Sequence, residues 1–346
     1  MTATIKDFSH RLFGKFQARY IPLLMVYFAY GASGLTGIAE AFWIKEKLSL
    51  SAEALVVIGF WVGLPWTIKM VFGQFADSVH IFGSGRKIYI FIGGGLVALG
   101  SLIMIGLAAE WPALLQFAEP GKLFFLASVV SIVGFVLQDV IADAMSTEVV
   151  ERTLPDGNPR PETEIDADLA QVQWLGRVSL MLAGVIVSGL GGWLAGMYSY
   201  ETMFTLGLLI PLISITGATF VRLNPVPRTQ INWPILGGGI AFGVFVISFA
   251  FFEIPYGQEV VFTVSLSTLI FMISKIGITK SVLCVALVLF IFRAIPGVGP
   301  GVGWWQIDIL GFDKAFQGTL QQIGSILSIV GLFFFRKYII EKPIGF

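Results

Sequence analysis

Ten runs of mostly apolar residues, each long enough to cross a lipid bilayer as a helix, follow one another along this chain. An α-helix needs about 20 apolar residues to span the hydrocarbon core. Strands of a membrane barrel would alternate polar and apolar residues over about 10 positions, and these runs do not alternate. The sequence predicts an all-α polytopic membrane protein with about ten transmembrane helices, at 20–44, 53–76, 88–109, 122–146, 168–198, 201–222, 234–254, 259–278, 281–306 and 315–338.

The composition supports this class and excludes several functions. Of the 346 residues, 56% are hydrophobic and 13% are charged, which is too little polar surface for a soluble domain. The formal net charge of +0 argues against a nucleic-acid partner. One cysteine, Cys284, and two histidines, His10 and His80, provide neither a disulfide nor a metal site. The nucleotide-binding loop GxxxxGKS/T and the hydrolase motifs GxSxG and HExxH do not occur, so we expect no enzyme and no cofactor.

Lysine and arginine are distributed unevenly between the connections on the two sides of the bilayer. The side that carries both termini holds most of these cations, and the other side holds only Lys45, Lys47, Lys122 and Lys314. Cytoplasmic loops carry an excess of lysine and arginine. We therefore expect a multi-pass protein of the cell (cytoplasmic or inner) membrane, surrounded by lipid, with both termini in the cytoplasm.

The beginning and the end of the chain resemble each other at a constant offset of 262 positions. Phe42-Trp43 corresponds to Trp304-Trp305, and in both places a short turn and another apolar run follow. Many transporters contain repeated helical bundles. The repeat predicts four parts: a cytoplasmic segment (1–19), a first six-helix bundle (20–222), an extra hairpin with linkers (223–280), and the first two helices of a second, incomplete bundle (281–346). The alternative is that the last four spans follow one another without an inserted pair.

Ionisable residues inside apolar spans are costly, and by default they indicate function. Asp139 and Asp143 lie four positions apart, so both are on one face of the fourth span. Two close carboxylates in a low dielectric need a proton or a cation, and Arg177 and Lys69 are candidate partners. One interpretation is proton coupling at Asp139 or Asp143. The other is a static ion-pair cluster that joins the helices.

Arg293 precedes a glycine- and proline-rich stretch that loosens or breaks its helix. An always-charged guanidinium at such a break can hold a carboxylate through two hydrogen bonds. A contact with substrate and an ion pair with Glu40 or Glu253 are both open. Glu40 is either an interior acid or a residue that reaches the membrane surface beside Lys45 and Lys47.

Five tryptophans could contact a flat ligand, but most tryptophans at span ends form an interfacial aromatic belt. Trp43, Trp304 and Trp305 lie at span ends and fit the belt. Trp66 lies in mid-span beside Pro65, so it is the candidate pocket residue.

The segment Leu64–Tyr89, LPWTIKMVFGQFADSVHIFGSGRKIY, joins the second and third spans. Gly73 and Asp77 lie toward the inner end of one helix, and Arg86 and Lys87 come just before the next. We expect these four residues to form a latch at a cytoplasmic gate. The alternative for Asp77 and Arg86 is a static ion-pair cluster that locks helices together near the cytoplasmic surface.

This segment resembles the second-span signature of the folate–biopterin transporter family, within the major facilitator superfamily. The matching residues are Leu64, Pro65, Trp66, Lys69, Gly73, Asp77, Gly85, Arg86, Lys87 and Tyr89. The Asp139/Asp143 pair is similar to the family's fourth-span acids. The stretch 290–338, with Pro296, Leu310-Gly311-Phe312 and Gly318, resembles the sequence at the start of the family's second bundle. The hairpin 234–278 and the end of the chain near Phe346 depart from the family pattern.

The resemblance implies two bundles that rock around a midplane site and transport folates or pterins together with protons. In this hypothesis a small anionic substrate binds to Arg293, Arg177, Lys69 and Trp66, and a proton exchanges at Asp139 and Asp143. The alternatives are a permease for another solute such as a muropeptide, and a non-transporting assembly factor or truncated remnant. The exact substrate, the direction of transport and the oligomeric state stay open.

Overall fold

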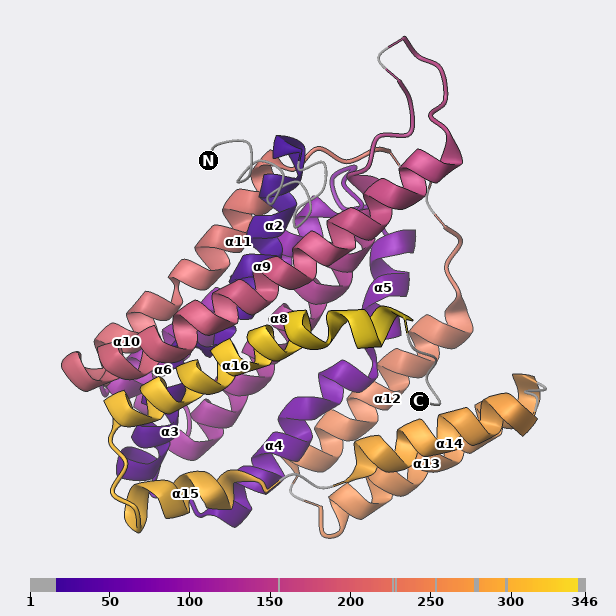
Figure 1. Ribbon diagram of the computed structural model, residues 1–346. Coiled ribbons are helices and arrows are strands. Elements are labelled where there is room, and N and C mark those ends of the chain that lie inside the picture. Colours follow the sequence, from indigo (N-terminus) through magenta and orange to yellow (C-terminus); the bar gives the residue numbers. More distant parts are fainter. Residues whose placement is uncertain are drawn as a thin grey trace, which may run out of the picture.

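The computed structural model describes residues 17–341, except 155, 226, 228, 253, 277–279 and 296–297. Long helices joined by short loops make up nearly all of this part of the chain (Figure 1). Within the described residues, β-type pairing is limited to two isolated bridges, Ile81–Ser84 and Thr153–Pro159. The predicted all-α class is therefore confirmed.

The first span is a series of short helical pieces. Pro22 lies at the start of the α-helix, where its missing N–H leaves no bond unmade. Gly31 and Gly37 flank a tighter 3-10 segment in the middle, and Gly34 lies within it. Ser49, directly after the last piece, has a left-handed backbone with a φ of 52°. The pieces are η1 (Ala18–Tyr20), α2 (Ile21–Gly31), η2 (Ala32–Thr36), α3 (Gly37–Trp43) and η3 (Ile44–Leu48).

The second span is divided by a break. It consists of α4 (Ala52–Thr67) and α5 (Lys69–Ser78), and Ile68 between them has a non-helical backbone with φ −105° and ψ 23°. Pro65, inside α4, cannot donate a helical hydrogen bond and crowds the preceding turn, which loosens the helix just ahead of the break. Lys69 is thereby placed at the first position of α5.

Four further spans follow along the chain. Gly93 and Gly134 bring two of them together: a Cβ on Gly134 would lie 2.5 Å from the carbonyl oxygen of Gly93, so only glycine allows this approach of the backbones. The helices are α6 (Lys87–Ala108), the short α7 (Pro112–Leu115), α8 (Pro120–Glu148), α9 (Glu162–Met197), α10 (Tyr200–Gly207) and α11 (Leu209–Phe220).

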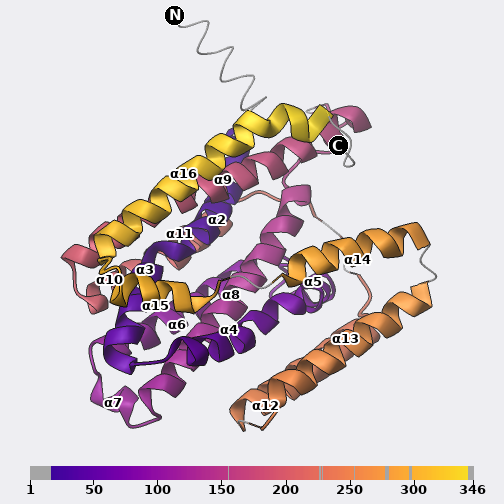
Figure 2. The same cartoon turned by 60° about the horizontal axis from the view of Figure 1, so that its bottom comes forward.

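The remaining helices are α12 (Trp233–Phe251), α13 (Gly257–Ile276), α14 (Lys280–Ala294), α15 (Pro300–Asp308) and α16 (Lys314–Glu341). Figure 2 shows α12, α13 and α14 on the opposite side of the molecule from the paired helices α9 and α16. The α9–α16 pair is close because Gly192 faces Gly318, and a Cβ on Gly192 would lie 2.4 Å from the Cα of Gly318.

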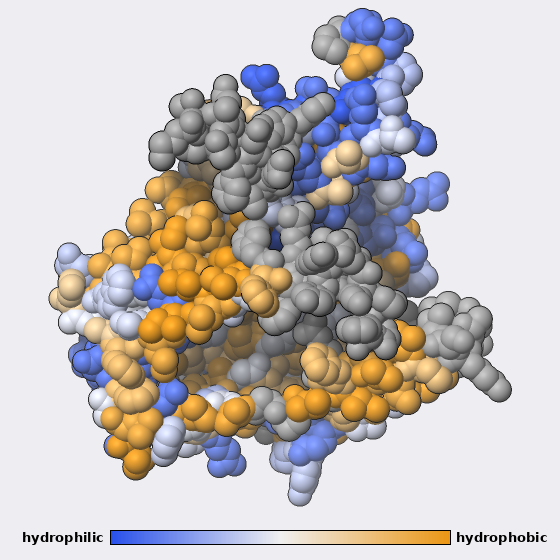
Figure 3. All heavy atoms as spheres, in the orientation of Figure 1, coloured by the Kyte–Doolittle hydropathy of each residue, from blue (hydrophilic) through white to orange (hydrophobic). Residues whose placement is uncertain are grey.

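The described residues of all ten predicted runs are mostly helical, but several of the runs are not one helix. Besides the first two spans, the run 201–222 is divided into α10 and α11, and the run 281–306 is divided because α14 ends at Ala294 and α15 begins at Pro300. Seven helices within the described residues, from Ala18–Leu48 to Trp233–Ala250, have the length and apolar composition needed to cross a membrane. In Figure 3 hydrophobic residues cover the α11 side and the α13–α14 side, and hydrophilic residues gather over the connector that precedes α9.

The position of Trp43 corrects the predicted aromatic belt. Trp43 is only 2% exposed and packs inside the bundle against Phe124 and Phe204. Trp43 lies at the end of α3, but its ring packs between helices and does not face the outside of the bundle. Trp305, in contrast, is 50% exposed.

Candidate functional site

An ion pair joins the second and fourth spans. The Lys69 ammonium donates a hydrogen bond to the Asp139 carboxylate, and it lies 5.3 Å from the centre of the Trp66 ring, within range of a cation–π contact. The Asp139 side chain is 6% exposed and that of Lys69 is 39% exposed. Among the described residues, Asp139 is the ion-pair partner of Lys69. The rest of the lysine side chain is partly accessible to water or to a ligand.

The second acid of the fourth span has a different pair of partners. The Tyr27 hydroxyl of α2 donates to Asp143 at 2.9 Å, and the Arg177 guanidinium of α9 lies 3.9 Å from the same carboxylate oxygen. The side chain of Arg177 is 63% exposed, so most of its donors are available. Asp139 and Asp143 thus face one way along α8, as their spacing predicts, and each has its own cation.

A buried amide extends this polar region into the bundle. Gln138 is 2% exposed and accepts a hydrogen bond from the Ser214 hydroxyl of α11 at 2.5 Å. Its amide nitrogen is buried without a hydrogen-bond partner among the described residues. Three helices therefore supply polar groups at one level of α8.

Two of the four predicted latch residues, Asp77 and Arg86, form an ion-pair cluster with a third residue, Glu148. Arg86 contacts Asp77 at 2.5 Å through Nη1 and Glu148 at 2.7 Å through Nε. Burial works against the charged guanidinium, but the hydrogen bonds to Glu148 and Asp77 outweigh it, so the pKa of Arg86 is raised. Arg86 therefore stays charged and ties together the ends of α5 and α8.

The two other predicted latch residues lie outside this cluster. The Lys87 ammonium donates to the carbonyl of Thr219 at 3.3 Å, which links it to the end of α11. Gly73 faces α8, where a Cβ would meet Val140 at 3.5 Å, an ordinary contact distance. The backbone at Gly73 therefore does not depend on glycine for space.

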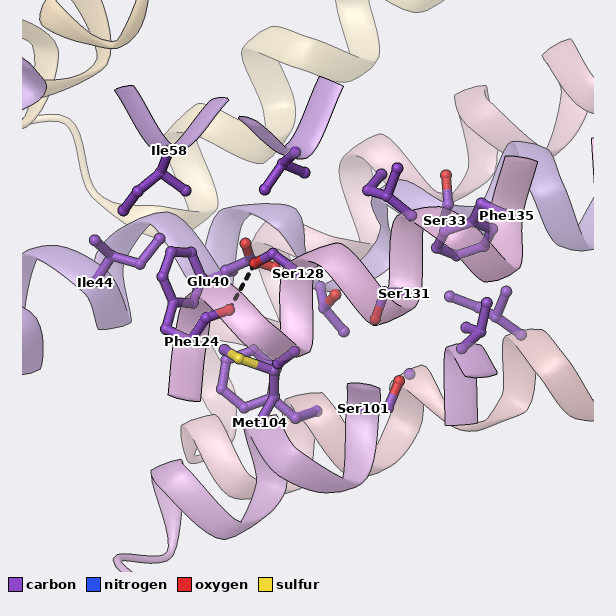
Figure 4. A pocket seen from close by; sticks show the side chains of 18 of the residues that line it. Ser33, Glu40, Ile44, Ile58, Ser101, Met104, Phe124, Ser128, Ser131 and Phe135 are labelled. Carbon is purple, nitrogen blue, oxygen red and sulfur yellow. Dashed lines mark hydrogen bonds between the residues drawn. The ribbon is translucent and has the colours of Figure 1, made fainter. Parts of the chain in front are cut away.

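A cavity of about 460 Å³ lies within the first bundle, on the far side of Trp66 from the latch. Its size is in the range of small-molecule sites. Trp66 lines it together with Tyr30 and Phe135, and the Tyr30 ring centre is 6.0 Å from that of Trp66 and 6.3 Å from that of Phe135. Figure 4 shows Glu40 of α3, Ser101 of α6, and Ser128 and Ser131 of α8 beside this space. Trp66 therefore lines a cavity, and its contact with a substrate stays a prediction.

Contacts at the opposite end of the bundle from the latch were not foreseen. Lys45 pairs with Asp308 of α15 at 2.5 Å and lies over the Trp304 ring. The Trp304 indole in turn donates to the carbonyl of Leu50 at 3.1 Å. This end of the first bundle is therefore fastened to the last part of the chain.

Sequence reasoning missed Tyr27 and Glu148 as well. Tyr27 lies in an apolar run of α2, and only its hydrogen bond to Asp143 of α8, which is distant in the sequence, indicates a role for it. Glu148 stands at the end of a span, where an acid is normally solvated, but it is 7% exposed. The side chain of Arg293, the fourth predicted substrate contact, lies outside the described residues.

Comparison with known proteins agrees with this architecture. The sequence profile of the BT1 family matches residues 31–345. The folate-biopterin transporter of Synechocystis sp. is 24% identical over 335 residues, which are 93% of this chain and 55% of that protein. Folate transporter 1 of Plasmodium falciparum is 24% identical over 221 residues, 63% of this chain and 39% of that protein. The chain thus spans about half the length, or less, of these relatives.

The fold also matches a solved structure. A crystal structure of the peptide transporter POT in complex with alafosfalin superposes with a TM-score of 0.57 over 94% of this chain and 69% of that chain, at 15% identity. This likeness establishes a major-facilitator-type fold for the helices described above. Together with the match over nearly the whole sequence, it shows that the chain belongs to the BT1 family, in agreement with the resemblance of its second span to folate–biopterin transporters.

Proposed function

We propose that this protein is a secondary active transporter that moves a folate or pterin across a membrane by alternating access. The observation that carries the proposal is the pair of cations Lys69 and Arg177, each held by one carboxylate of α8, beside an aromatic cavity. Ion pairs at this depth in the membrane are expensive unless they are used. The names of the relatives, which are transporters of folate and biopterin, support a transporter and not an enzyme.

The substrate carboxylates would bind to Arg177 and Lys69. Both cations are more than a third exposed, so each can accept a second anion without losing its helix contact. Trp66, which already lies against Lys69, provides a face for an aromatic part of the substrate. Arg293 is included on the sequence argument alone, as a further carboxylate contact next to the break between α14 and α15.

Proton coupling would follow from competition for these cations. A substrate carboxylate that binds Arg177 would weaken the ion pair between Arg177 and Asp143. A substrate carboxylate that binds Lys69 would weaken its ion pair with Asp139 in the same way. A carboxylate without a cation in a low dielectric binds a proton more readily. Substrate and proton would therefore enter together and leave together.

The second half of the mechanism requires a second bundle, and the repeat at an offset of 262 supports one. The left-handed residues Ser49 and Gly311 are 262 positions apart, with φ angles of 52° and 67°. The helices that follow them, α4 and α16, begin at Ala52 and Lys314, again 262 apart. On this basis 20–222 is a first bundle, 223–280 an inserted hairpin with linkers, and 281–346 the opening of a second bundle.

Two gates would control access to the site. The cytoplasmic gate contains Gly73, Asp77, Arg86 and Lys87, and the structure adds Glu148 as the second anchor of Arg86. The Lys45–Asp308 pair would close the other side. The excess of lysine and arginine on the side of the termini supports a cytoplasmic-membrane location with both termini inside.

Uptake measurements test the proposal. Cells that express the gene from its natural start to its natural stop are supplied with labelled folate, biopterin or a muropeptide, and membrane vesicles are then tested with and without an inward proton gradient. Saturable uptake of folate or biopterin that rises with the gradient is expected. Uptake of the muropeptide alone, or of no compound, would reject the proposed substrate class.

A further inference from the structure

Glu40 is an acid inside the cavity whose role the proposed transport cycle leaves open. It belongs to α3, lines the cavity, and lies close to Ser128 in Figure 4. Within the described part of the chain no side chain forms a hydrogen bond or an ion pair with its carboxylate. The nearby cations are engaged elsewhere, since Lys45 pairs with Asp308 and Lys47 with Glu110.

A carboxylate in such a place needs hydrogen-bond donors. Burying an unpaired acid is costly. The other polar side chains that line the cavity carry hydroxyl groups: Tyr30, Ser33, Thr36, Ser101, Ser128 and Ser131. The Ser128 hydroxyl is already used, because it donates to the carbonyl of Phe124 at 2.9 Å. The cavity therefore presents an acceptor, weak polar neighbours and an apolar remainder, which suits a neutral ligand that carries donors.

The walls of the cavity specify the shape of that ligand. Aromatic rings of Tyr30, Trp66 and Phe135 line one region, with neighbouring ring centres 6.0 and 6.3 Å apart. Aliphatic side chains and Met104 line much of the rest. Rings favour stacking with a flat heterocycle. The Lys69 ammonium, which is not among the residues that line the cavity, lies 5.3 Å from the centre of the Trp66 ring.

We infer that this cavity binds the heterocyclic end of the substrate, with the Glu40 carboxylate accepting two parallel hydrogen bonds from an exocyclic amino group and the adjacent ring N–H. A 2-amino-4-oxopyrimidine edge, as in pterins, has these two donors side by side, and a carboxylate is its geometric complement. An anionic tail on the same substrate would then extend past Trp66 to Lys69 and Arg177. This inference rests on the proposed function and adds the orientation of the substrate and the reason for its selection.

This assignment predicts a preference for ligands that present hydrogen-bond donors to Glu40. A site built around a hydrogen-bond acceptor discriminates strongly against analogues that lack the donor. Lumazine differs from pterin in having a second carbonyl where pterin has the amino group, so it would place an oxygen against the Glu40 carboxylate. Wild-type protein should therefore prefer pterin to lumazine.

Binding to the protein reconstituted in lipid nanodiscs tests this assignment, with pterin, lumazine and p-aminobenzoylglutamate as probes. We expect wild-type protein to bind pterin at least about tenfold more tightly than lumazine. Glu40→Gln should abolish that preference and leave p-aminobenzoylglutamate, which has only the anionic part, bound as before. The unchanged third probe also shows that the variant is folded. Glu53→Gln, an exposed acid at the start of α4, is the matched control.

The outcomes separate the two proposals. If Glu40→Gln keeps the wild-type preference for pterin, the Glu40 assignment is wrong while the transport proposal stands. If wild-type protein binds pterin and lumazine equally, the assignment is also wrong. If wild-type protein binds neither folate nor any of the three probes, the proposed function fails and this inference fails with it. Glu40→Asp, which keeps the charge on a shorter side chain, should retain part of the preference.

Discussion

Lys69 and Asp139 form an ion pair between α5 and α8 in which the acid is buried and the cation is open on one side. Replacement of Asp139 by alanine leaves the lysine without its partner. Loss of one member of a fully buried pair costs about 3–5 kcal/mol, and we expect about half of that here because Lys69 is 39% exposed and can reach water. The melting temperature in detergent should fall by about 5 °C.

The same pair gives a test of function that is separate from stability. The double variant Lys69→Met/Asp139→Leu removes both charges, so its melting temperature should recover toward that of the wild type. Uptake should stay below about one tenth of the wild-type rate, since the substrate contact is gone. Full uptake by the double variant would show that the pair is only structural.

Asp143 is expected to carry the coupled proton. Asn has the same shape but cannot be protonated, so Asp143→Asn should lose accumulation of substrate driven by a proton gradient and keep exchange of internal for external substrate. Vesicles with an imposed pH gradient measure both activities. Asp166→Asn, an exposed acid in α9, should leave both unchanged. Gradient-driven accumulation by both Asp143→Asn and Asp139→Asn would contradict the coupling proposal.

The guanidinium group of Arg86 should be required for stability, and a lysine at this position should not replace it. Arg86→Lys keeps a charge but presents one point donor group where the guanidinium reaches Asp77 and Glu148 from different nitrogens. Because Glu148 is 7% exposed, we expect a loss of about 2–3 kcal/mol for Arg86→Ala and roughly half of that for Arg86→Lys. Thermal unfolding measures both. Arg152→Ala, which removes only an exposed bond to a backbone carbonyl, is the control and should have no effect.

The α9–α16 crossing should depend on Gly318 in particular. A Cβ at Gly318 would lie 2.7 Å from the Cα of Gly192, whereas a Cβ at Gly324 in the same helix meets nothing within 4 Å. Gly318→Val should lower the melting temperature by several degrees, since overpacking costs about 1–3 kcal/mol, and Gly324→Val should leave it nearly unchanged. Equal losses of melting temperature for the two variants would contradict the close contact between Gly318 of α16 and Gly192 of α9.

The Lys45–Asp308 pair should control opening without much effect on stability. Its members are partly exposed, so the pair contributes only about 0.2–1 kcal/mol. Lys45→Glu should nevertheless repel Asp308 and widen the distance between spin labels placed at Ser49 and Ile309 in a protein without Cys284. Asp308→Lys added to Lys45→Glu should restore the distance. If the distance between the spin labels is the same in the wild type, in Lys45→Glu and in the double variant, the Lys45–Asp308 pair is not a gate.

Hydrophobicity determined most of what could be predicted about this fold. Runs of apolar residues at spanning length can satisfy their backbone in lipid only as helices, so all ten form helices. The break in the run 281–306 lies in a glycine- and proline-rich stretch that was visible in the sequence, and α15 begins there with Pro300 at its first position after Gly299, whose φ is 68°. The face that each helix turns to its neighbours was not visible, because apolar residues surround the spans on all sides. Trp43 was misplaced for that reason.

The candidate site was predictable to the extent that charge at membrane depth is rare. Lys69, Asp139, Asp143 and Arg177 were identified from depth and spacing, and the structure pairs them as expected. Tyr27 was missed because a hydroxyl gives no signal in an aromatic-rich run. Glu40 was ambiguous because direction around the helix axis, and not depth, separates a surface acid from a cavity acid.

The break at Ile68 makes α5 a short rod with a task at each end. Lys69, its first residue, holds the Asp139 carboxylate, and Asp77, near its last, holds Arg86. These residues are about 12 Å apart along one helix, and the break at Ile68 separates that helix from α4, which carries the cavity residue Trp66. In the proposed transport cycle, a substrate that binds Lys69 therefore acts on the same helix whose other end holds Arg86.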